Sequence, residues 1–162
     1  MISVLFRLSK LARPQLEYGP LKKAFADLAP AHPVQVRQTV LQIRDGKLPD
    51  PAVLGSAGSF FINPVVSKEV FDRVVATPRS DAVPHYEVGP DQIKIPAAWL
   101  IDQCGLKGAI HGQAAVYEKQ PLVIVNATGD APPQDILTLE QKVIDTVRQK
   151  FGIELSPEVE HI

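Results

Sequence analysis

The chain has little that would support disulfide formation, metal binding or membrane insertion. Cys104 is its one cysteine among 162 residues, so no intramolecular disulfide can form, and we expect a reducing, cytoplasmic setting. The four histidines have no metal-ligand spacing, which disfavours a metal site. The longest apolar runs, such as 96–101 and 121–125, are far too short to span a bilayer. With 17 basic and 18 acidic residues the formal net charge is −1, so we expect no nucleic-acid or membrane partner.

Common catalytic and cofactor motifs are also missing. There is no GxGxxG and no Walker-type loop, so the sequence contains no recognisable dinucleotide cradle. Ala57 and Phe61 stand where the Gly-x-Ser-x-Gly elbow around Ser59 would need glycines, which disfavours a serine hydrolase. Cys104 lies in an apolar segment without an obvious histidine partner, and we expect a buried small residue rather than a nucleophile.

What is present is the composition of an ordinary globular chain, with 45% hydrophobic and 22% charged residues. Apolar spacing, prolines and glycines predict helices over 20–28, 32–44, 67–76, 96–105 and 133–151, and strands over 2–8, 93–95, 114–117 and 122–126. Gly46 should end the second helix, 48–63 and 77–90 should be loops, and 153–162 an extended tail. Helices and hairpins mix without regular alternation, which predicts an α+β fold with helices packed on a small antiparallel sheet.

The segment 55–64, GSAGSFFINP, holds the first candidate for chemistry. Its glycines permit close backbone approaches, and Phe60 and Phe61 can anchor it in the core. That arrangement would leave Ser59 on a fixed backbone. Taken by itself, the same composition is also typical of a simple glycine turn that leads into Pro64.

Other polar residues are candidates, each with an ordinary alternative. Glu158 follows Pro157, which fixes the backbone, and could donate a proton or pair with a charge; the alternative is a solvated surface acid. Lys47 borders the loop and could bind phosphate, although an exposed lysine is equally expected. Tyr18 and Tyr86 lie in polar loops and could contact a sugar or a base.

Four segments, taken in order, resemble a known family. They read GSAGSFFINPVVS, KIPAAWLIDQCGLKG, AAVYEKQPLVIVN and LSPEVEHI, and VLFRLSK, LEYG and KLPDP upstream also fit. Together they resemble the C-terminal part of UDP-N-acetylenolpyruvoylglucosamine reductase, over nearly the whole chain. The segment around Tyr86 resembles the longer, type I form of the family.

The resemblance implies a reaction and residues for it. In the family, FAD reduced by NADPH gives a hydride to UDP-N-acetylglucosamine-enolpyruvate, and the product is the UDP-N-acetylmuramate of peptidoglycan. The proton donor of the family falls on Ser59, and its late glutamate falls on Glu158, close to the substrate carboxylate. The family's UDP-sugar contacts imply substrate-binding roles for Tyr18, Lys47, Asn63 and Tyr86. Ser56 and Ile62 depart from the usual pattern, which commonly has asparagine and lysine there.

The resemblance also implies a domain organisation. Residues 1–32 would be the end of a flavin-binding domain and a linker, and 33–162 the C-terminal substrate-binding domain. The family's N-terminal flavin-binding region has no counterpart in these residues, so we expect this chain alone to bind no FAD and to be inactive. Two alternatives stay open: a stand-alone nucleotide-sugar binding module without catalysis, and a purely structural interaction domain.

Overall fold

The computed structural model describes residues 3–27, 32–77 and 82–161. These fall into two compact units, Met1–Lys47 and Leu48–Ile162, which we call unit 1 and unit 2. Compactness does not show which domain of a longer protein a segment belongs to, so the predicted boundary between residues 32 and 33 stays a prediction.

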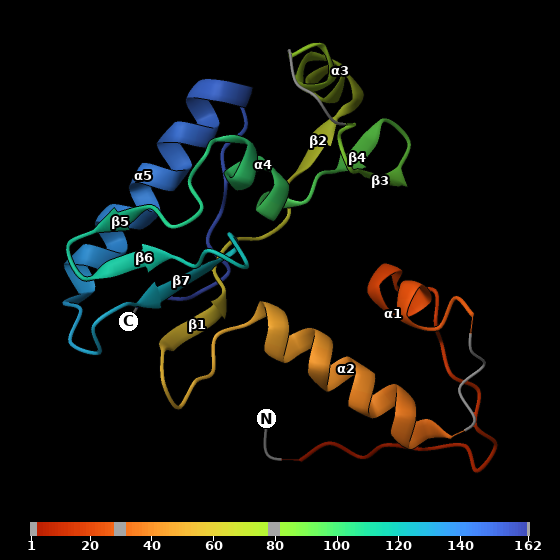
Figure 1. Ribbon diagram of the computed structural model, residues 1–162. Coiled ribbons are helices and arrows are strands. Elements are labelled where there is room, and N and C mark those ends of the chain that lie inside the picture. Colours follow the sequence, from red (N-terminus) through yellow and green to blue (C-terminus); the bar gives the residue numbers. More distant parts are fainter. Residues whose placement is uncertain (1–2, 28–31, 78–81, 162) are drawn as a thin grey trace. The chain divides into compact units, whose positions relative to one another are not determined.

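Unit 1 contains two helices, α1 (Gly19–Ala24) and α2 (Pro33–Lys47), which contact each other (Figure 1). Among its described residues only Leu21 is buried. The predicted strand over 2–8 is wrong for residues 3–8, which are extended but unpaired; residue 2 lies outside the described part. A strand needs a neighbour for its hydrogen bonds, and both described sheets are built from unit 2.

The predicted ends of these helices need correction. Gly46 does not end α2: its φ is not left-handed, and the helix continues to Lys47. The more effective stop is Pro49, which disfavours helical geometry at the residue before it. The first helix begins as predicted, with Pro20 in its first turn, but ends at Ala24.

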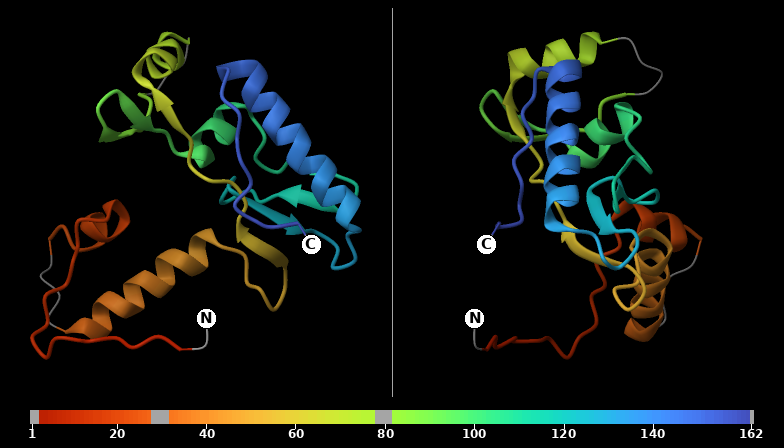
Figure 2. Two further views of the ribbon diagram at one scale, coloured as in Figure 1. Left: turned by 180° about the vertical axis from the view of Figure 1, so that it is seen from behind. Right: turned by 90° about the vertical axis from the view of Figure 1, so that its left-hand side faces the viewer.

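A four-stranded antiparallel sheet forms the centre of unit 2. Its strands, in the order β1-β7-β6-β5, are β1 (Gly55–Ser59), β7 (Val123–Asn126), β6 (Ala114–Val116) and β5 (Ile110–His111). The β6-β7 hairpin confirms the sequence prediction, whereas β5 was missed. The long helix α5 (Pro133–Phe151) lies along this sheet, and the C-terminal tail runs back beside it (Figure 2).

The apolar stripe of α5 faces the core as predicted. Leu139, Val143, Val147 and Phe151 are buried, and Ile136 packs partly against them. Gly152 ends the helix with a φ of 67°, a left-handed value that favours glycine.

Strand β1 overturns the loop prediction for its residues. Glycine, serine and alanine carry no strand periodicity, yet their backbone groups pair with β7, since ladder hydrogen bonds do not require a particular side chain. The ladder is irregular between Ser56 and Ser59, where Gly58 has a φ of 80°.

A second antiparallel sheet has the order β2-β4-β3, with β2 (Val65–Ser67), β4 (Gln92–Lys94) and β3 (Tyr86–Gly89). Strand β3 corrects the predicted loop over 77–90, of which 78–81 lie outside the described residues. Helix α3 (Lys68–Ala76) begins as predicted, since Ser67 Oγ accepts a hydrogen bond from Val70 N at 3.3 Å. Phe71 and Val74 are buried, whereas the neighbouring Val75 is 45% exposed.

Helix α4 (Ala97–Gln103) completes the core of unit 2. Pro96 stands at its N-cap and Gly105, with a φ of 69°, follows its end, as the sequence predicts. Ala97, Leu100 and Ile101 are fully buried. The α+β prediction is confirmed, with two small sheets in place of one. None of the helices in the described ranges is long and apolar enough to cross a membrane.

Candidate functional site

The segment that follows β1 pairs with the C-terminal tail, and this pairing joins the neighbourhoods of Ser59 and Glu158. Glu158 N donates to Phe60 O at 2.9 Å, and Ile62 N donates to Ser156 O at 2.9 Å. Phe61 and Pro157 lie directly opposite each other between these two bonds. Proline has no N–H to donate, and this position of an antiparallel ladder does not require one. We call the pairing of 60–62 with 156–158 the site ladder.

Ser59 is exposed but stands on a fixed backbone. The next residue, Phe60, donates its N–H to Leu122 O at 2.8 Å, which ties the segment to the turn before β7. Phe60 and Phe61 are buried, the latter with 1% of its surface exposed, and their ring centroids lie 5.3 Å apart. The aromatic anchoring expected from the sequence is therefore present, and the hydroxyl of Ser59 faces solvent without a protein partner among the described residues.

Glu158 is exposed as well. Its register position is opposite Phe60, one step along from Ser59. Within the described part of the chain, no hydrogen bond or ion pair engages its carboxylate. The structure thus brings the two segments side by side and leaves both side chains available to a ligand.

Asn63 has a structural contact that the sequence did not indicate. Its Oδ1 accepts a hydrogen bond from Ala97 N at 2.8 Å, so it caps α4 from 34 residues away. Pro96 provides no side-chain cap of its own. The side-chain oxygen of Asn63 is therefore used by the fold, and its Nδ2 group is the part that could donate to a ligand.

Tyr86 begins β3, is exposed, and lies opposite Lys94 of β4. Directly opposed residues of antiparallel strands have Cβ atoms about 5 Å apart, so the side chains of Tyr86 and Lys94 leave the sheet on the same face. Sequence reasoning did not select Lys94, since its position depends on a strand pairing that the sequence did not reveal. A phenol beside an ammonium suits an anionic, hydrogen-bonding ligand.

The two remaining candidates belong to unit 1. Tyr18 is the N-cap residue of α1 and is exposed. Lys47 is the last residue of α2, exposed, at the point where the chain enters unit 2.

A groove of about 440 Å³ lies in unit 2 between β1, the start of α5 and the tail. Its walls are mainly apolar, and its lining residues include no lysine or arginine. The helix that begins beside it starts with Pro132 and Pro133, which have no N–H to offer. A dinucleotide such as FAD needs helix N-terminal amides or basic groups for its pyrophosphate, so this groove does not fit that cofactor.

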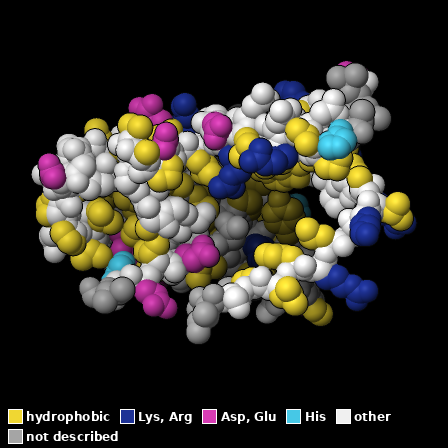
Figure 3. Space-filling model, turned by 90° about the horizontal axis from the view of Figure 1, so that it is seen from below, with side chains coloured by type: hydrophobic (Ala, Val, Ile, Leu, Met, Phe, Trp, Pro, Cys, Tyr) yellow, Lys and Arg dark blue, Asp and Glu magenta, His cyan; other side chains and the backbone are white. Residues whose placement is uncertain are grey.

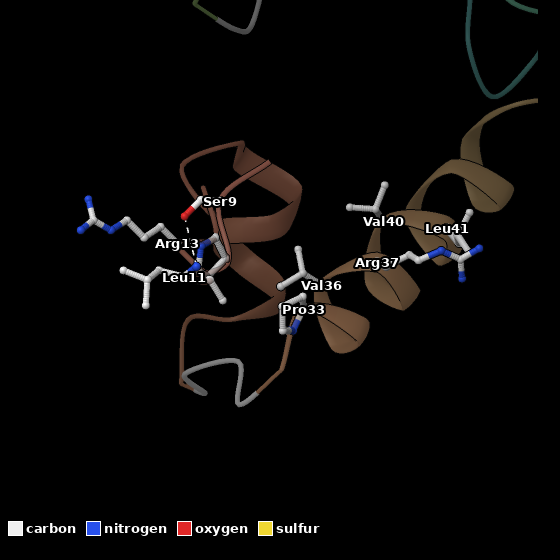
Figure 4. A pocket seen from close by; sticks show the side chains of 10 residues that line it. Ser9, Leu11, Arg13, Pro33, Val36, Arg37, Val40 and Leu41 are labelled. Atoms are coloured by element: carbon white, nitrogen blue, oxygen red, sulfur yellow. Dashed lines mark hydrogen bonds between the residues drawn. The ribbon is translucent and has the colours of Figure 1, made fainter. Parts of the chain in front are cut away.

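Unit 1 contains a second hollow, of about 470 Å³, between the segment 9–14 and α2. Figure 4 shows that the guanidinium groups of Arg13 and Arg37 extend in opposite directions from it. They do not converge on a single anion, so this hollow also lacks the features of a phosphate site.

Neither metal nor thiol chemistry gains support. Within the ranges that the structure describes, no group of three or more histidine, cysteine, aspartate or glutamate side chains could hold a metal ion. Burial raises the pKa of the Cys104 thiol above its ordinary value, and the nearby Lys150 ammonium offsets part of that rise. A raised pKa disfavours the thiolate and hence a nucleophilic role.

Comparison with known proteins gives a consistent result. A family model described as UDP-N-acetylenolpyruvoylglucosamine reductase, C-terminal domain, matches residues 50–162. A protein of that reductase name from Bacteroides fragilis is 45% identical over 98% of this chain and 47% of its own length. Its counterpart from Porphyromonas gingivalis is 46% identical over 91% of this chain and 43% of its own length. The chain thus spans about half the length of the curated relatives it matches.

Proposed function

Because the chain belongs to the UDP-N-acetylenolpyruvoylglucosamine reductase family, in which it matches the C-terminal domain, we propose that it is the substrate-binding and proton-donating part of such an enzyme. The longer enzyme would reduce UDP-N-acetylglucosamine-enolpyruvate to UDP-N-acetylmuramate for peptidoglycan, in the cytoplasm. The observation that carries this proposal is the site ladder, which sets an exposed serine and an exposed glutamate, far apart in sequence, on neighbouring segments.

In this proposal Ser59 supplies the proton. Hydride addition to the methylene carbon leaves negative charge on the neighbouring carbon and its carboxylate, and the hydroxyl of Ser59 donates to that carbon. A serine hydroxyl is a poor acid, so the donor must be held close and in a fixed direction. The buried anchors Phe60 and Phe61 meet that requirement. Glu158, one register step away, would act at the substrate carboxylate, where it assists the protonation.

The remaining candidates would bind the UDP-sugar. Asn63 can donate from Nδ2 while Oδ1 caps α4. Tyr86 would contact the ligand beside the Lys94 ammonium, which suits a phosphate. Tyr18 and Lys47 of unit 1 would add a hydroxyl and a positive charge.

We place FAD and NADPH in the part of the longer enzyme that this chain does not span. The lining of the unit 2 groove includes no lysine or arginine, and the helix beside it begins with two prolines, so we assign no flavin contact to the described residues. We expect the chain alone to lack reductase activity.

The surface of unit 1 supports a larger assembly. Four large side chains of the extended segment 3–8 are more than half exposed, namely Val4, Leu5, Phe6 and Leu8. Figure 3 shows hydrophobic side chains at the surface over the face that it displays. Exposed apolar surface of this kind is typical of an interface, and we propose that the flavin-binding part covers it.

A chimaera tests the proposal. This chain would replace the matching C-terminal part of the Bacteroides fragilis relative, and NADPH oxidation dependent on UDP-N-acetylglucosamine-enolpyruvate would be followed by absorbance. Ser59→Ala is expected to lower kcat by about 100-fold or more, since general acid catalysis contributes on that scale. Ser56→Ala, at another exposed serine of β1, is the matched control and should stay close to the unsubstituted chimaera.

Two outcomes would count against the proposal. If the chimaera is folded, flavin-loaded and active, and Ser59→Ala has the same kcat as Ser56→Ala, then Ser59 is not the proton donor. A chimaera that binds the UDP-sugar but never oxidises NADPH would favour the stand-alone binding module.

A further inference from the structure

Glu140 is a buried charge on α5. It is 6% exposed, and it is the one charged side chain that is buried within the described part of the chain. Its neighbours along the helix, Leu139 and Val143, are fully buried. Withdrawing a carboxylate from water to this degree is costly unless a partner compensates for the lost hydration.

The partner comes from the tail. His161 Nε2 lies 3.0 Å from Glu140 Oε2, and the imidazole side chain is 49% exposed. Across the described residues, Oε2 has no partner with hydrogen-bond geometry, and the contact with His161 is an ion pair when the imidazole is protonated. This contact therefore joins α5 to the tail at a position three residues beyond Glu158.

The backbone pairing that holds the tail next to Glu158 is short. The site ladder consists of two backbone hydrogen bonds, one on each side of the Phe61–Pro157 pair. Beyond it, Val159 packs partly against the core, and Val159, Glu160 and His161 form one wall of the unit 2 groove. No backbone hydrogen bond among the described residues continues the site ladder through these three positions. Glu158 thus lies between a short ladder and the contact with α5.

We propose that Glu140 and His161 form a latch that fixes the segment 158–161 and thereby orients the Glu158 carboxylate. They are positioning residues and touch no substrate themselves. The latch follows from the contacts above; its consequence for catalysis rests on the proposed function of Glu158.

Amide hydrogen exchange in the 162-residue chain tests the latch. In His161→Ala, the amides of Glu158 and Ile62, which make the site ladder, are expected to exchange about 5-fold faster, the effect of a partly exposed ion pair on local opening. The amides of Phe60 and Tyr117, which donate to Leu122 O and Val123 O in the body of unit 2, should not change.

Matched variants separate a latch from general stabilisation. His161→Lys places a cation within reach of Glu140 and should keep exchange slow, whereas His111→Ala, at an exposed histidine of β5, should have no effect. Glu140→Gln should raise the exchange of the same two amides, and adding His161→Ala to it should raise it no further.

Three results would show that Glu140 and His161 do not form a latch. Unchanged exchange at both ladder amides in His161→Ala would do so, as would a failure of His161→Lys to restore protection. A uniform increase across unit 2 would also do so, because it would indicate global destabilisation.

The catalytic consequence of the latch is measured separately, from the kcat and KM of the chimaera. His161→Ala should lower kcat with little change in KM, since the latch orients an acid rather than the UDP-sugar. Faster exchange with unchanged kcat would keep the latch and remove the role proposed for Glu158.

Discussion

Replacing Asn63 by alanine should destabilise unit 2 through the loss of a long-range helix cap. Asn63 Oδ1 accepts from Ala97 N at 2.8 Å, and Ala97 is fully buried, so water does not readily replace the lost acceptor. Unsatisfied buried donors and lost N-caps each cost about 1 to 2 kcal/mol. The helix affected is α4, whose Leu100 and Ile101 lie in the core. The lost cap should therefore lower the free energy of cooperative unfolding of unit 2.

Urea denaturation followed by tryptophan fluorescence would measure this, because Trp99 lies on α4. With an m value of about 2 kcal/mol per M, the midpoint should fall by about 0.5 to 1 M. Ile62→Ala is the control: this neighbouring side chain is exposed, and its loss should change the midpoint little. If Asn63→Ala and Ile62→Ala unfold at the same urea concentration as the parent chain, the capping argument is wrong.

Asn63→Asp separates capping from substrate binding. Aspartate keeps an acceptor for Ala97 N and places negative charge at a helix N-terminus, so the free energy of unfolding should stay within about 0.5 kcal/mol of the parent. The same change removes the Nδ2 donor, and the affinity for the UDP-sugar should fall about 10-fold, as for one lost hydrogen bond. Titration followed by NMR would show it, and unchanged affinity would remove Asn63 from the substrate site.

Two further predictions concern stability and reactivity. Gly112→Ala should lower the free energy of unfolding by about 2 to 4 kcal/mol, because φ is 52° and the added Cβ would overlap the Asp135 carboxylate. Gly129→Ala is the control: its φ is 94°, but no described atom lies within 4 Å of the added Cβ, so the loss measured by thermal denaturation should be about 1 kcal/mol. Cys104 should react slowly with thiol reagents at pH 7 and faster as the pH rises past the ordinary thiol range, because burial raises its pKa. Lys150→Gln should slow this reaction further, since the substitution removes the positive charge that lowers the pKa of Cys104. An equal or faster reaction in Lys150→Gln would contradict this assignment of the cause.

Local patterns predicted the parts of the fold that depend on local interactions. The stripe of α5 and its glycine stop, the Ser67 cap of α3 and the β6-β7 hairpin all follow from residues within one turn or one hairpin of each other. Strand β1 was predicted as a loop because its partner β7 lies far away in sequence and its small residues carry no period of two. Strand β3 pairs with β4, which follows it directly, but its short stretch of mixed residues also carries no period of two.

The same limit applies to the candidate site. Spacing alone left Ser59 as part of an ordinary turn and Glu158 as a surface acid; the family resemblance selected them. The site ladder links distant segments through backbone groups, which leave no signature in side-chain patterns. The cap from the Asn63 side chain to Ala97 N likewise spans a distance in sequence that local spacing does not reveal. Lys94 was missed for that reason, since only the register of β3 and β4 places it opposite Tyr86.

Phe60 explains how the proposed proton donor can be ready before any ligand binds. Its N–H donates to Leu122 O and its C=O accepts from Glu158 N, so its two backbone groups are bound to two different segments. Its ring is buried as well, and the backbone next to Ser59 is thus held from three directions by unit 2 alone. A weak acid contributes to catalysis mainly through such fixed placement. In unit 1, by contrast, large apolar side chains stand exposed, so the larger assembly that we propose would complete the surface of unit 1 and leave the geometry around Ser59 unchanged.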